Sequence, residues 1–105
     1  MGMWNPFRSA NPIWVVLGKA CADNANSLYP VGEKHAFLAM VRSEEQSVNV
    51  RVSGLLAVNG WTNFAIERFK LLNDPFISDD PTMIKCYAAA SRKDGGVIIY
   101  SDPEP

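Results

Sequence analysis

Cys86 and His35 are the nucleophile and base that the sequence offers. A thiol needs a neighbouring base or a helix N-terminus to ionise near neutral pH. The two residues are 51 positions apart in the chain, so their spacing does not indicate that they meet. Cys86 falls inside a predicted helix, where a small apolar side chain is typical of a core residue. The sequence therefore favours structural roles for both, and they remain its catalytic candidates.

Asp79 and Asp80, with Asp74 nearby, form an acidic cluster. A calcium loop needs alternating oxygen ligands and a closing glutamate, and this spacing provides neither. The pair precedes Pro81, where carboxylates cap a helix and complement the positive end of its dipole. We therefore predict a helix cap, and we expect neither a metal site nor a cofactor.

Tryptophan is unusually frequent for so small a core. The chain has three Trp in 105 residues, and Trp4 and Trp61 fall in predicted loops. Trp is enriched at the centres of protein interfaces because it offers a large, stiff apolar surface with one donor. Alternatively, Trp4 and Phe7 fold back onto the domain and Trp61 covers the end of the sheet. Trp4, Phe7 and Trp61 are the predicted binding residues.

Composition narrows the class of protein. The chain is 48% hydrophobic with a formal net charge of -1, and a single domain of this size buries roughly two-thirds of its unfolded surface. No apolar run approaches the ~18 residues of a membrane helix. The charges balance segment by segment, without the basic stripe of a nucleic-acid binder. We expect neither a membrane nor a nucleic acid as partner.

The N-terminus and the cysteines indicate the compartment. Residues 1–8 lack the charged start, apolar stretch and small-residue cleavage site of a secretory signal. Two cysteines are too few for a disulfide framework, and neither belongs to a CxxC pair. These features favour a reducing, cytoplasmic setting.

Two strands are predicted in the first half of the chain. Residues 13–22 continue a period of two, but Asn11 followed by Pro12 also fits a helix start, so both interpretations stay open and the strand is preferred. Residues 35–41 alternate with apolar side chains on both faces, which is typical of a central strand covered on both sides. Residues 23–34 are predicted to form a surface loop.

Segments 48–58 and 62–72 differ in their hydrophobic period. In 48–58 apolar residues recur at every second position, which predicts a strand with a bulge at Gly54. In 62–72 they recur at i, i+4 and i+7, which predicts a helix. Asn59-Gly60 is typical of a hairpin turn, and we place it at the passage from strand to helix.

The last third of the chain is predicted to hold a helix and a strand. Pro81 suits the first turn of a helix over 79–94, and Gly95 or Gly96 suits its end. Residues 97–100 form a short apolar strand that should pair with one of the first three strands. Residues 102–105 are expected to be a frayed acidic tail.

Together these elements predict a single α+β domain over residues 13–101, preceded by an irregular arm over 1–12. The sheet is expected to be mostly antiparallel with about four strands, with both helices packed on one face in the order β-β-β-α-α-β. The first or last strand is expected to leave an open edge for pairing between chains.

The sequence favours a small, non-catalytic protein-binding module. It would contact another protein or a second copy of itself as a homodimer, in the manner of an inhibitor, an immunity protein or a phage accessory protein. The alternative is a small enzyme or ligand-binding domain with a pocket between sheet and helices, near Cys86 and His35.

Overall fold

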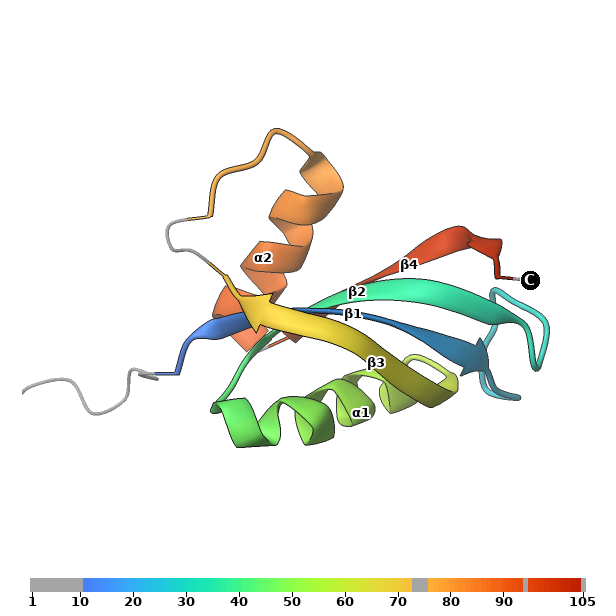
Figure 1. The fold of residues 1–105 in the computed structure, drawn as a ribbon. Helices are drawn as coiled ribbons and strands as arrows, with labels where there is room; N and C mark the ends of the chain where they lie inside the picture. Colours follow the sequence, from blue (N-terminus) through green and yellow to red (C-terminus); the bar gives the residue numbers. More distant parts are fainter. Residues whose placement is uncertain (1–10, 73–75, 94, 105) are drawn as a thin grey trace, which may run out of the picture.

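The computed structural model describes residues 11–72, 76–93 and 95–104. The strands form one antiparallel sheet in the order β3-β1-β2-β4. Within these residues the α+β class, the four strands and the two helices are confirmed, and residues 13–22 form the preferred strand. The elements in chain order are β1 (Ile13–Ala22), β2 (Lys34–Arg42), a 3₁₀ turn (Glu45–Ser47), α1 (Val48–Val58), β3 (Trp61–Leu71), α2 (Pro81–Lys93) and β4 (Gly95–Pro103) (Figure 1).

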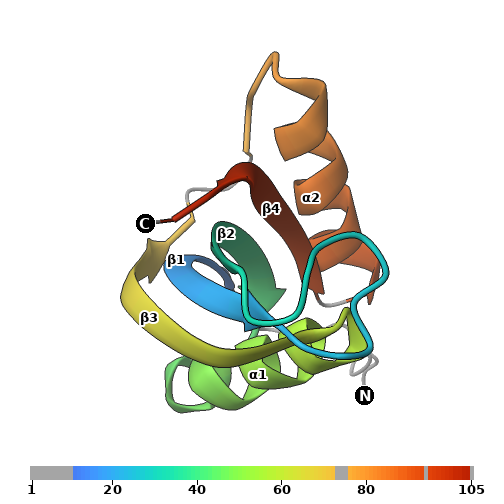
Figure 2. The ribbon, with the colours of Figure 1, turned by 90° about the vertical axis from the view of Figure 1, so that its right-hand side faces the viewer.

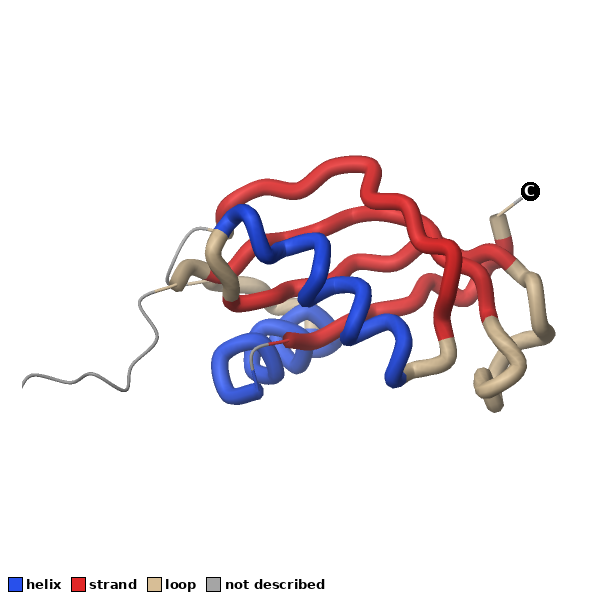
Figure 3. Tube along the Cα trace, turned by 90° about the horizontal axis from the view of Figure 1, so that it is seen from below, coloured by secondary structure: helices blue, strands red, loops and turns tan. Residues whose placement is uncertain are grey.

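The two helices lie on opposite faces of the sheet, with α1 below it and α2 above it in Figure 1. Figure 3 shows α1 from below, lying across the strands. Side chains of β2 alternate between the two layers: Phe37, Ala39 and Val41 pack with α1, and Leu38 and Met40 pack with α2. A central strand with two apolar faces needs cover on both, so the prediction that both helices share one face is wrong.

Residues 48–58, predicted to be a strand, form α1. Its buried residues Val48, Val52 and Leu56 are four apart, a spacing that puts them on one face of either a strand or a helix. Val50 and Val58, expected on that same face, are instead 74% and 81% exposed. The apolar residues at every second position indicated a strand, but tertiary packing overrides this local pattern.

Residues 61–71, most of the predicted helix, form the edge strand β3. Its pairing with β1 shifts register twice, between Leu17 and Gly18 and between Lys19 and Cys21. Extra residues at such bulges break the alternation of a strand and leave apolar spacings that mimic a helix. The order of elements is therefore β-β-α-β-α-β, not the predicted order.

The Asn59-Gly60 turn joins a helix to a strand. Gly60 has φ 84°, the left-handed conformation that commonly ends a helix. A Cβ on Gly60 would lie 2.8 Å from the Cα of Asn26, and the Nδ2 of Asn26 donates a hydrogen bond to the Gly60 carbonyl at 3.0 Å. The turn thereby fixes the β1–β2 loop beside the end of α1, as Figure 2 shows.

Gly95 and Gly96 begin β4 and do not cap α2. A Cβ on Gly96 would lie 2.7 Å from the Cys86 carbonyl oxygen, so this glycine lets α2 lie close against β4. The strand pairs with β2 and runs to Pro103. Beyond it the Glu104 amide donates to the Lys34 carbonyl at 2.7 Å, so residues 102–104 lie along the sheet edge.

Two glycine-to-alanine changes test this packing in opposite directions. Gly18→Ala would drive a Cβ into the Ala65 carbonyl oxygen and to 2.9 Å from the Cζ of Phe37, so we expect the free energy of unfolding to fall by about 2–3 kcal/mol. Gly54 lies exposed within α1, and a Cβ added there would meet no atom within 4 Å. Because alanine favours a helix more than glycine does, Gly54→Ala should raise the free energy of unfolding by about 0.5–1 kcal/mol. Urea unfolding measures both changes in stability. Equal effects of the two substitutions would contradict the close packing at Gly18 and the open space at Gly54.

Candidate functional site

The sheet separates Cys86 from His35. His35 is fully buried on β2 against the rings on the α1 side, whereas Cys86 packs into the α2 layer with Leu38 and Met40. Burial raises the pKa of Cys86 to about 11, although a hydrogen bond with the Met40 backbone partly opposes this. The predicted nucleophile and base therefore share no site, and Cys86 is a poor nucleophile at neutral pH.

Thiol labelling tests the state of Cys86. Iodoacetamide at mildly alkaline pH should label Cys21, which is partly exposed, and spare the buried Cys86 in the folded protein. Mass spectrometry should find one adduct in native protein and two in urea. Cys21→Ser should abolish native labelling and Cys86→Ser should leave it unchanged; rapid alkylation of native Cys86 would contradict the assignment.

His35 joins three segments of the chain. Its Nδ1 lies 2.6 Å from the Tyr100 carbonyl oxygen on β4, and its Nε2 lies 2.7 Å from Oε1 of Glu33. The ring packs at a tilt of 46° against Tyr29 of the β1–β2 loop, with 4.2 Å between centroids, and it meets Trp61 of β3 edge-on at 5.5 Å. Tyr29, His35 and Trp61 therefore form an aromatic cluster, in which two oxygen acceptors contact the ring nitrogens of His35.

The two oxygens favour a charged His35 ring. A carbonyl oxygen only accepts hydrogen bonds, so Nδ1 carries a proton, and a proton on Nε2 lets the ring donate to Glu33 as well. Burial lowers the pKa of His35, but the hydrogen bonds to Glu33 and Tyr100 and the charges of Glu33 and Asp102 outweigh it and raise the pKa above 6.5. The hydrogen bonds therefore favour the protonated ring, which packs at a tilt beside the Tyr29 ring.

This protonation predicts a pH dependence of stability. Because the pKa of His35 is raised from 6.5 in the folded protein, its contribution is complete below pH 6.5 and is lost as the pH rises through the folded-state pKa. His35 is the chain's single histidine, so NMR of its ring protons gives the midpoint directly. Urea unfolding across pH should show stability declining through the same range.

Glu33→Gln should lower the NMR midpoint and flatten the stability profile, because it removes the carboxylate that faces Nε2. Glu45→Gln is the matched control: Glu45 is exposed in the 3₁₀ turn, and its change should leave both measurements as they are. A midpoint at or below 6.5 in the unaltered protein would contradict the assigned charge state.

The aromatic cluster adjoins a cleft of about 480 Å³ on the α1 side of the sheet. Trp61 and Tyr29 line it together with Val97 and Ile99 of β4, and the end of α1 and residues 25–28 of the loop complete the wall. Trp61 is only 5% exposed. It therefore forms the wall of a cleft and does not project as the surface anchor that its predicted loop position suggested.

Asn26 holds the loop side of the cleft in place. Its Oδ1 accepts hydrogen bonds from the Leu28 and Tyr29 amides at 3.0 and 2.9 Å, while its Nδ2 is committed to Gly60. Asn59 is likewise committed, since its Nδ2 donates to the Leu55 carbonyl at 2.7 Å. The amide side chains lining the cleft thus serve the local fold, and the cleft presents both polar and apolar groups.

Two exposed aliphatic side chains stand at the cleft. Leu28 is 82% exposed and Val58 is 81% exposed, and both line the cleft. Tyr29, Leu28 and Val58 were not predicted from the sequence, because nothing in the local pattern distinguishes them from ordinary loop or core residues. The Asn59-Gly60 turn was the available signal, since it brings the loop and the helix end together. Trp4 and Phe7, the other predicted binding residues, lie outside the described residues.

The open edges of the sheet are β3 and β4, whereas β1, one of the two predicted edges, is internal. β3 carries two register shifts, and Asn63 within it has φ 49°. Bulges of this kind twist an edge strand away from further pairing. β3 is therefore a protected edge and a poor template for a strand from another chain.

Asp80 acts as the predicted helix cap, since its Oδ1 accepts a hydrogen bond from the Thr82 amide at 2.9 Å.

Over residues 11–72, 76–93 and 95–104, no three or more His, Cys, Asp or Glu side chains gather closely enough to hold a metal. In the same part of the chain, no helix is both long and apolar enough to cross a membrane. No protein-family model, curated protein or solved structure matches the chain.

Proposed function

We propose that this protein is a small, non-catalytic binding module that acts through contact with another protein. The observation that carries the proposal is the cleft of about 480 Å³ with Trp61 and Tyr29 in its wall and the exposed Leu28 and Val58 beside it. An apolar side chain of the partner would enter the cleft, and Leu28 and Val58 would be covered by the partner's surface.

Two properties of the cleft support a protein as the occupant. Interfaces concentrate their binding energy where a side chain fills a desolvated pocket surrounded by further apolar contact, and exposed apolar surface beside such a pocket supplies that contact. The Nδ2 groups of Asn26 and Asn59 each donate a hydrogen bond within the fold, so these two groups are less available to orient a small polar ligand.

The kind of module and its compartment belong to the same proposal. A small domain that presents one pre-formed cleft suits an inhibitor, an immunity protein or a phage accessory protein, each of which works by occupying a partner. The free Cys21 and Cys86 support a reducing, cytoplasmic setting. A protein partner is preferred to a nucleic acid because the residues described as lining the cleft include no Lys or Arg.

Selection from a displayed library of random peptides tests the proposal. The unaltered protein should enrich peptides that share a large apolar residue at one position, because one side chain fills the cleft. Leu28→Asp and Val58→Asp should each weaken the selected peptides at least about tenfold, as loss of an apolar interface contact does. Titration by fluorescence anisotropy measures the affinities.

Val50→Asp is the matched control. Val50 lies on α1 like Val58 and is 74% exposed, but it does not line the cleft. Its change should leave peptide affinity unaltered. The proposal fails if no peptide family is enriched, or if the cleft variants and the control bind the selected peptides equally well.

Binding of a small apolar molecule is the second candidate function. The volume of the cleft falls within the roughly 300–1,000 Å³ typical of small-ligand sites. The site of this alternative lies beside the aromatic cluster of His35 and away from Cys86. Fragment screening by NMR distinguishes the two: saturable fragments that shift the Trp61 indole signal, without any enriched peptide, would favour the small ligand.

A further inference from the structure

A second hollow lies on the other face of the sheet, between β1 and β3. Its volume is about 170 Å³, and Val15 and Leu17 line it from β1 while residues 68–70 line it from β3. α2 packs mainly on β4 and β2, so Val15 and Leu17 stay partly exposed. We call this hollow the β1–β3 groove.

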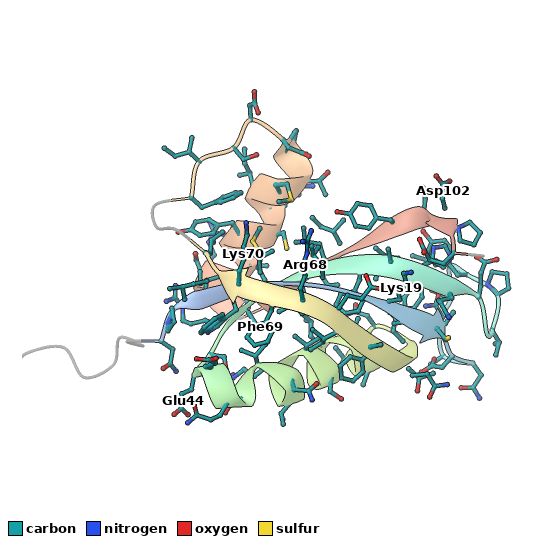
Figure 4. All side chains as sticks on the ribbon, in the orientation of Figure 1. Lys19, Glu44, Arg68, Phe69, Lys70 and Asp102 are labelled. Atoms are coloured by element: carbon teal, nitrogen blue, oxygen red, sulfur yellow. The ribbon has the colours of Figure 1, made fainter. Side chains whose placement is uncertain are left out.

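Two cations stand along the groove. Arg68 pairs across the sheet with Leu17 and Lys70 pairs with Val15, so each cation lies beside one of the apolar side chains. Figure 4 shows Arg68 and Lys70 above β3, on the side of α2, with Phe69 below it. The groove therefore combines an apolar floor with a positively charged edge.

Neither cation is neutralised within the part of the chain that the structure describes. The nearby Glu67 contacts Lys19 at 3.4 Å, and Glu104 contacts the same lysine at 3.1 Å, while no ion pair involves Arg68 or Lys70 among the described residues. An occupant that suits the groove carries an apolar side chain with carboxylates close by.

The chain itself presents such a segment before α2. Ile77 is 86% exposed, and the exposed Asp79 and Asp80 follow it within three residues. The segment is held in shape: Phe76 stacks on Tyr87 at 5.2 Å, and the Asp80 amide donates to the Ser78 hydroxyl at 3.1 Å. Ile77 thus projects outward from a segment whose neighbouring residues are held by these contacts, which lowers the entropy cost of binding.

We propose that a second copy of this chain docks here, with Ile77 on Val15 and Leu17 and Asp79 beside Arg68 and Lys70. In a two-fold dimer each contact forms twice, because the groove and the Ile77 segment belong to the same chain. The surface lies on the opposite face of the sheet from the cleft, so the dimer does not depend on the proposed function.

Sedimentation equilibrium of the full chain tests the proposal. We expect a reversible monomer–dimer equilibrium that weakens as salt is raised, because exposed ion pairs are screened. Ile77→Asp should raise the dimer dissociation constant roughly tenfold or more. The change leaves the fold intact because Ile77 is almost wholly solvated, and circular dichroism verifies this. Val50→Asp, a control on α1 at a residue that is also largely exposed, should leave the equilibrium unaltered.

A charge exchange tests the pairing itself. Arg68→Glu and Asp79→Lys should each weaken the dimer, and the double variant should recover it, because only the exchanged pair restores opposite charges at both contacts. Arg51→Glu, on the exposed face of α1, is the control for a change of net charge.

Three results would overturn the proposal. One is a chain that stays monomeric to millimolar concentration, and another is a dimer that responds equally to the groove and control variants. The third is a monomer whose groove binds the peptide acetyl-Ile-Ser-Asp-Asp-amide, since it would assign the groove to a separate acidic partner. None of these results bears on peptide selection by the cleft, so failure of one proposal is distinguishable from failure of the other.

Discussion

The side of the sheet that carries the cleft depends on the burial of His35 between two oxygens. Water is excluded from the ring, so the Tyr100 carbonyl and the Glu33 carboxylate must satisfy both nitrogens, because an unpaired polar group is costly in the interior. That requirement joins the end of the β1–β2 loop to β4. Tyr29 and Trp61 then pack on the ring, and the cleft takes its shape from their position.

Close backbone contact fixes the remaining geometry. Gly60 places the end of α1 against the loop at Asn26, and Gly96 places α2 against β4. Each is a contact between elements distant in sequence, and each fails if a side chain is added. The cleft is therefore a product of long-range packing, although its lining residues come from short and ordinary stretches of chain.

The predictable parts of the fold were those in which one local pattern pointed to a single structure. Strand β2, apolar on both faces, and α2, begun by Asp80 and Pro81, were predicted, and so was the α+β class. The helix and strand assignments of residues 48–58 and 62–72 were interchanged. A spacing of four between buried residues suits both a helix and a strand, so 48–58 was ambiguous. In 62–72 the bulges of β3 interrupt the alternation that would have indicated a strand. Trp61 was predicted to lie in a loop, but it lies in β3 and is buried, because it packs on Tyr29 and His35, which lie far from it in the sequence.

The charges show most clearly why counting residues along the sequence does not predict the folded surface. The net charge of -1 and the balance within each segment indicated that no charged patch exists. On folding, Lys19 engages both Glu67 and Glu104, and Glu67 is the acidic neighbour of Arg68 in the chain. Arg68 and Lys70 are then left beside the apolar Val15 and Leu17, while Asp79 stands apart before α2. A neutral chain thus presents separated charges of both signs, and their separation makes the surface complementary to a second copy of itself.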